Sequence, residues 1–228
     1  MKTRKLIVTA AMMLATTVWP TAAQTNTELF SFVVNNGAVP DANYSGFADT
    51  RSITVTNSFS TISDLKVTLD ISGGYNGDLY AYLVHGSGFS VLLNRPGRTS
   101  GNLFGYGDAG FNITLSDSAA SDLHLYGGNG GSPLGGVWQP DGRNVAPATV
   151  LGTDTRSAFL SSFTGLNANG PWTLFVADFA AGGQSTLQSW GLQITTIPEP
   201  AIGMLGILAG ALIGLRALLF RSPRRPRK

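Results

Sequence analysis

Apolar and polar residues alternate along six short stretches of this chain, and residues that favour turns separate the stretches. In residues 64–71, for example, every second position is apolar. A period of two places side chains alternately on the two faces of a β-strand. The alternating stretches are residues 51–57, 64–71, 77–85, 111–116, 171–178 and 185–194. Glycine-rich or asparagine-rich clusters, typical of turns, stand between them: GGYNGD, HGSG, NRPG, NANGP and AAGGQ.

Residues 24–196 show no helical periodicity, so the sequence predicts an all-β domain of two packed antiparallel sheets. About 170 residues are enough for one domain with a sizeable core. Residues 125–144 (LYGGNGGSPLGGVWQPDGRN) are too rich in glycine and proline for a strand. We expect a long surface loop there, where functional contacts are common.

The first 23 residues have the features of a secretory signal peptide. Basic MKTRK precedes the apolar LIVTAAMMLATTVW, and small residues end at Ala23, the expected cleavage site. The chain has no cysteine, so an exported domain would depend on its core, with or without bound ions, and not on disulfides.

Charge is distributed very unevenly along the chain. Residues 24–200 contain 6 of the 15 basic residues and all 13 acidic ones, a net charge of −7. The basic residues that remain lie at the two ends. A nucleic-acid-binding domain needs a basic face, so we expect no nucleic-acid partner.

The C-terminus combines three features in order. Ile197-Pro198-Glu199-Pro200 is followed by an apolar run at residues 201–220, and residues 221–228 contain five basic side chains. Twenty apolar residues can form a helix that crosses a hydrocarbon core of about 30 Å. The basic tail favours a cytoplasmic end, which places the domain outside.

This C-terminal arrangement resembles the PEP-CTERM sorting signal, whose usual form begins with Val-Pro-Glu-Pro. The resemblance implies recognition of Pro198, Glu199 and Pro200 by an exosortase, a multipass membrane protease. The inner membrane would hold the chain through its helix until processing. Such proteins belong to the envelope and extracellular polymer of biofilm-forming Gram-negative bacteria.

The domain itself, over about residues 50–195, resembles the P domain (Homo B domain) of proprotein convertases. The resemblance rests on Gly77-Asp78-Leu79, Arg95, the segment 170–174 (GPWTL), Asp178 and Trp190. It implies a jelly-roll β-sandwich. The subtilisin-like protease that usually accompanies such a domain does not occur in the printed sequence, which implies a stand-alone adhesive or stabilising module.

We expect no catalysis by this chain. A Ser-His-Asp triad needs a histidine between an acid and a serine, and only His85 and His124 exist. Neither lies in a catalytic motif, and no Gly-x-Ser-x-Gly occurs. GYGDAG at residues 105–110 matches a dinucleotide fingerprint but precedes a strand pattern, so we interpret it as a glycine-rich turn.

Two kinds of ligand stay open for the domain. Asp70, Asp78 and Asp178 are candidate calcium ligands, with solvated acids at strand ends as the alternative. The aromatic candidates for stacking on a polysaccharide are Trp138, Trp172, Trp190, Tyr80 and Tyr82. Trp172 and Trp190 fall on apolar faces, which favours core packing, whereas Tyr80 and Tyr82 face the other way.

The sequence therefore predicts a non-enzymatic exported β-sandwich that an exosortase sorts to the cell surface or extracellular matrix. The alternative is a permanently anchored envelope protein whose domain binds glycan or protein. A secreted hydrolase that uses His85 or His124 comes third.

Overall fold

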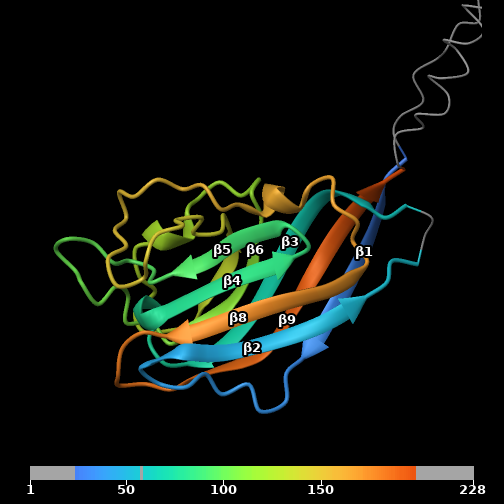
Figure 1. Ribbon diagram of the computed structural model, residues 1–228. Helices are drawn as coiled ribbons and strands as arrows, with labels where there is room; N and C mark the ends of the chain where they lie inside the picture. Colours follow the sequence, from blue (N-terminus) through green and yellow to red (C-terminus); the bar gives the residue numbers. More distant parts are fainter. Residues whose placement is uncertain (1–23, 57–58, 199–228) are drawn as a thin grey trace, which may run out of the picture.

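The computed structural model describes residues 24–56 and 59–198, and these residues form two stacked β-sheets (Figure 1). One sheet has five strands in the order β1-β9-β3-β6-β7, and the other has four in the order β2-β8-β4-β5. The strands are β1 (Asn26–Val33), β2 (Asn43–Ile53), β3 (Thr61–Gly73), β4 (Leu79–His85), β5 (Gly88–Asn94), β6 (Gly110–Leu115), β7 (Leu134–Trp138), β8 (Gly170–Asp178) and β9 (Ser185–Ile197). Three short 3₁₀ helices are η1 (Asn76–Asp78), η2 (Leu123–Leu125) and η3 (Leu160–Phe163).

The predicted all-β architecture is confirmed. Five of the six alternating stretches lie on strands β3, β4, β6, β8 and β9, and the stretch 51–57 overlaps the end of β2. The five turn clusters also lie between or just beyond strands. HGSG closes the β4–β5 hairpin, in which His85 pairs with Gly88 and Gly86 has a φ of +57°.

Four features differ from the prediction. Strand β1 and most of β2 lie outside the six alternating stretches. The pair β6–β7 is parallel, because the chain crosses over through residues 116–133 before β7 begins. Residues 125–144 are not all loop, since Leu134–Trp138 forms β7 despite two glycines. Strand β5 lacks clear alternation because the segment around residues 141–158 covers it: Val91 N–H donates to Ala158 O at 3.1 Å, and Asp141 N–H donates to Leu92 O at 3.0 Å.

The hydrophobic core lies between the sheets and includes one tryptophan from each. Trp172 on β8 and Trp190 on β9 are at most 1% exposed, which confirms the prediction that both are core residues. Their indole N–H groups are satisfied, by Ala168 O at 2.9 Å and by Asp49 Oδ2 at 2.6 Å. Buried tryptophans usually need such partners.

The two ends of the described chain emerge at the same end of the sandwich. Strands β1 and β9 pair with Asn26 opposite Thr196, at the upper right of Figure 1. At the other end of β9, Ser185 pairs with Gly73, the last residue of β3. Thirteen residues of strand span about 40 Å, so the turns after β3 and β8 lie far from the chain ends. We call this the distal end.

In residues 24–56 and 59–198, no helix is long and apolar enough to cross a membrane. The expected signal peptide with Ala23, the residues Glu199 and Pro200, the predicted helix at 201–220 and the basic tail lie outside the described residues.

Candidate functional site

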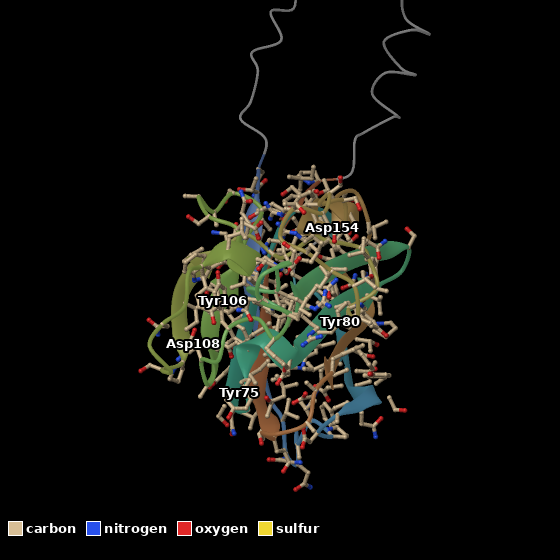
Figure 2. All side chains as sticks on the ribbon, turned by 90° about the vertical axis from the view of Figure 1, so that its left-hand side faces the viewer. Tyr75, Tyr80, Tyr106, Asp108 and Asp154 are labelled. Carbon is tan, nitrogen blue, oxygen red and sulfur yellow. The ribbon has the colours of Figure 1, made fainter. Side chains whose placement is uncertain are left out.

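A cleft of about 290 Å³ opens at the distal end, and we call it the distal cleft. Three turns that are far apart in the sequence form it: the segment after β3, the loop before β6 and the turn after β8. Figure 2 looks onto the molecule from this side and shows Tyr75, Tyr106 and Asp108 near one another. The lining residues are Tyr75, Asp78, Phe104, Gly105, Tyr106, Gly107, Ala180 and Ala181.

Backbone hydrogen bonds dock η1 onto the loop before β6. Asn76 N–H donates to Asp108 O at 2.9 Å, and Gly77 N–H donates to Tyr106 O at 2.8 Å. The Asn76 side chain also bonds both backbone groups of Gly110, at 2.8 and 3.0 Å. A Cβ at Gly77 would lie 2.2 Å from the Phe104 carbonyl oxygen, so only glycine permits this close approach.

Asp108 supports the Tyr106 wall of the cleft through hydrogen bonds to residues that pack against it. Its carboxylate accepts hydrogen bonds from Tyr126 Oη at 2.6 Å, from Asn129 N–H at 2.8 Å and from Gly131 N–H at 2.7 Å. Tyr126 in turn packs on Tyr106 with ring centroids 4.3 Å apart. Burial, followed by the bond to Asp108, raises the pKa of Tyr126. The glycine-rich segment 127–131 thus serves to hold Asp108 and the Tyr106 wall.

Two buried carboxyl groups, those of Asp78 and Asp178, lie next to each other at the distal end. Leu79 pairs with Asp178, which brings Asp178 next to Asp78, and both are at most 5% exposed. Burial raises the pKa of Asp178 to about 6. The hydrogen bond from Ala180 N–H and the charge of Arg95 lower this pKa, whereas the charges of Asp78 and Asp41 raise it further. Asp178 Oδ1 accepts from Ala180 N–H at 3.1 Å, while Oδ2 is buried without a hydrogen-bond partner.

Arg95 only partly compensates these acids. Burial raises the pKa of Asp78, although Arg95 lowers it. The closest approach of Arg95 Nη2 to Asp78 Oδ1 is 3.5 Å, whereas Arg95 Nε donates to Gly77 O at 2.9 Å. Burial also lowers the pKa of Arg95, whose φ of +51° is rare for a residue other than glycine. Strained backbone and poorly matched buried charges are both typical of functional sites.

The predicted calcium ligands are placed in two different regions. Asp78 and Asp178 come together, but Asp70 lies on β3 of the other sheet, opposite Asn112 and Ser189. Within the described part of the chain, no three acidic or histidine side chains gather as a metal site. Asp78 and Asp178 are also not solvated acids, since both are buried. Calcium binding stays a prediction.

Neither histidine is solvated, and neither faces a serine. His85 is 6% exposed and stacks on Trp172 with ring centroids 4.0 Å apart. Its ring nitrogens face the carbonyl oxygens of Pro171 at 2.8 Å and Asn167 at 2.6 Å. His124 is fully buried, with Nδ1 at 2.7 Å from Asp141 Oδ2 and Nε2 at 3.0 Å from Arg98 O.

The sequence pointed to some of this site and missed the rest. Asp78, Asp178 and Arg95 were marked through the P-domain resemblance, and here they form one cluster. GYGDAG is a loop, as predicted, but its Tyr106 and Asp108 build the cleft, which no pattern indicated. The cleft combines aromatic walls with a buried carboxyl at its edge, so it can hold a small group that offers hydrogen-bond donors.

Comparisons with known proteins leave the family open. No protein-family model matches the chain, and no curated protein matches it. Among solved structures, the chain is similar to the serine protease of Aeromonas sobria, both in the crystal structure of that protease and in the crystal structure of its complex with a chaperone. In both cases the identity is 17%, the TM-score is 0.44, and the match covers 77% of this chain. The chain spans only 28% of the length of each matched chain.

Proposed function

We propose that this chain is a non-enzymatic, exported β-sandwich protein that an exosortase sorts and processes at its C-terminus. Its destination is the cell surface or the extracellular matrix. The sandwich is of the jelly-roll type and resembles a P domain, used here as a stand-alone module. The signal peptide directs export, and the helix and basic tail hold the chain in the inner membrane until processing.

The observation that carries the proposal is the position of the two chain ends. Thr196 pairs with Asn26 at one end of the sandwich, and the distal cleft lies about 40 Å away at the other. Pro198 directly follows Ile197, the last residue of β9. A membrane protease acting near residue 200 would therefore meet the folded domain at its attachment end. The cleft would point away from that membrane.

The histidine geometry supports a non-enzymatic role. All four ring nitrogens of His85 and His124 lie within 3.0 Å of a carbonyl or carboxylate oxygen. General-base activation of a serine needs one ring nitrogen hydrogen-bonded to its hydroxyl.

Changing the Pro-Glu-Pro motif tests the sorting step. In the producing cells, Glu199→Ala combined with Pro198→Ala and Pro200→Ala is expected to leave most of the protein in the inner membrane as a longer form. The reason is that the extended, charged recognition segment is lost. Fractionation and gel mobility of the protein measure this.

Ile197→Val is the matched control, because valine is the usual residue of the resembled motif, and it should leave sorting unchanged. Identical fractions and mobility for the triple variant and the parent would contradict exosortase processing. That result would favour the permanently anchored alternative.

A further inference from the structure

The outer face of the four-stranded sheet carries six aromatic side chains, which we call the aromatic face. On β4, Leu79, Ala81 and Leu83 point into the core, so Tyr80 and Tyr82 point outward. The strand register places Tyr82 opposite Phe175. The six residues are Tyr44 on β2, Tyr80 and Tyr82 on β4, Phe89 on β5, Phe175 on β8 and Phe179 directly after β8.

The six rings contact one another in a continuous series across the sheet. Tyr44 stacks on Phe179 at 4.4 Å between centroids, and Phe179 lies 6.0 Å from Tyr80. Tyr80 lies 5.8 Å from Tyr82, which stacks on Phe175 at 4.7 Å. Tyr82 also lies 5.6 Å from Phe89. Because the rings hold one another in place, a ligand would not have to order them, which lowers the cost of binding.

The aromatic face remains partly open to solvent. Tyr44 is 67% exposed, and the other five rings are only partly buried. The segment around residues 141–158 borders the face at β5, where Asn94, opposite Tyr80, donates through Nδ2 to Arg143 O at 2.9 Å and to Val145 O at 3.0 Å. The β2 side is open: Ala48, Thr50 and Ser52 are exposed there.

No outward-facing side chain of this sheet is charged among the described residues. The positions beside the rings carry small, aliphatic, hydroxyl or amide side chains, and Thr50 and Thr173 hydrogen-bond each other at 2.8 Å. Burial raises the pKa of Tyr80, so its phenol stays neutral. These outward positions are Ala48, Thr50, Ser52, Thr173, Ala177, Val84 and, on β5, Val91 and Asn94.

We infer that the aromatic face binds a neutral polysaccharide. The C–H groups on the face of a sugar ring are weakly positive and stack on the negative faces of aromatic rings. Where the rings meet at an angle, their centroids are 5.6–6.0 Å apart, which is on the scale of one sugar ring, so the series from Tyr44 to Phe89 is longer than a single sugar unit. Phenol and threonine hydroxyls at the edges match sugar hydroxyls.

The absence of charge decides between ligand classes. A charged polymer would need complementary charges on the face, and the outward side chains of β2, β4, β5 and β8, all within the described residues, carry none. Arginine and methionine, which are enriched with aromatics in protein interfaces, are also absent from it. The inference rests on the proposed export only for the source of the polymer, because binding itself is a property of the purified chain.

Affinity electrophoresis of the full chain, in a detergent without a sugar headgroup, tests the inference. The gels contain hydroxyethyl cellulose, xylan, galactomannan or dextran, with alginate as the charged comparison. We expect at least one neutral polymer to retard the parent chain. Tyr44→Ala and Tyr82→Ala should each weaken its apparent affinity about 3- to 10-fold, the loss expected for one stacked ring. Tyr82→Phe, which keeps the ring, should retain binding.

Two exposed residues away from the aromatic face provide matched controls. Leu29 and Val33 on β1 are 76% and 72% exposed. Leu29→Ala and Val33→Ala should bind as the parent does. Tyr44→Ala keeps the test valid if Tyr82→Ala fails to fold, because Tyr44 is largely exposed.

The inference is overturned if no neutral polymer retards the chain, or if alginate alone does. It is also overturned if Phe104→Ala weakens retardation while Tyr44→Ala does not, since the ligand would then occupy the cleft. The sorting proposal stands or falls separately, on the fractionation of the Pro-Glu-Pro variant.

Discussion

Replacing Asp141 with alanine is expected to lower the free energy of unfolding by about 3–5 kcal/mol, because it leaves buried polar partners without their acceptor. Asp141 is fully buried. Its Oδ2 lies 2.7 Å from His124 Nδ1, and its Oδ1 lies 3.3 Å from Arg143 Nη1. Arg143 is 2% exposed and His124 fully buried, so water cannot replace the lost carboxylate. Urea unfolding followed by tryptophan fluorescence measures the change.

Asp70→Ala is the matched control for Asp141→Ala. Asp70 is only partly buried on β3, so its removal should change stability by no more than about 0.5 kcal/mol. A loss below about 1 kcal/mol for Asp141→Ala would show that this network does not hold the segment around residues 141–158 onto β5.

The second large effect has the opposite sign: Asp178→Asn is expected to stabilise the fold at pH 7 by about 2–3 kcal/mol. The folded state raises the pKa of Asp178 from 3.8 to about 6. Above pH 6 the carboxylate is charged in both states, and burying it costs stability in full. As the pH falls from about 6 to 3.8 the cost disappears, so the advantage of the variant should vanish near pH 4. Unfolding curves at pH 4 and pH 7 measure this.

Asp108→Asn provides the contrast, because Asp108 is also a buried acid at the distal end but accepts three hydrogen bonds. All three of its partners are donors, so the amide should destabilise the protein at pH 7. Equal stability of Asp178→Asn and the parent at pH 7 would contradict the burial argument. The same curves with calcium or chelator test the predicted ion: a calcium-dependent stabilisation lost in Asp178→Asn would assign it to this acid pair.

If Asp178→Asn proves more stable than the parent at pH 7, the natural carboxyl is kept at a cost to stability, which is the pattern of a group retained for function. Proteins retain unfavourable groups mainly where function requires them. Asp178 is not held by a well-formed ion pair, since Arg95 lies closer to Gly77 O than to either acid.

Much of the fold was predictable because most strands bury one face and so alternate. Strand β5 was missed for the opposite reason: Val91, Leu92 and Leu93 are all buried, and nothing in the local pattern shows the segment that covers them. Strand β7 contains Gly135 and Gly136, and it exists because β6 offers a free edge for parallel pairing.

The candidate site was less predictable than the strands. Tyr75, Tyr106 and Ala180 converge on the cleft from turns separated by tens of residues, and a turn pattern indicates where the chain reverses, not which turns meet. The aromatic face is a similar case. Tyr80 and Tyr82 alternate with buried leucines within one strand, whereas Phe175 and Phe179 join them only through the β4–β8 register.

The mass of the C-terminal peptide, taken from protein recovered at the cell surface or in the extracellular matrix, tests the proposed sorting most directly. We predict a peptide that ends before the basic tail at residues 221–228, because processing near Pro198-Glu199-Pro200 would remove the apolar run and the tail together. Surface protein that still ends in RSPRRPRK would contradict the proposal.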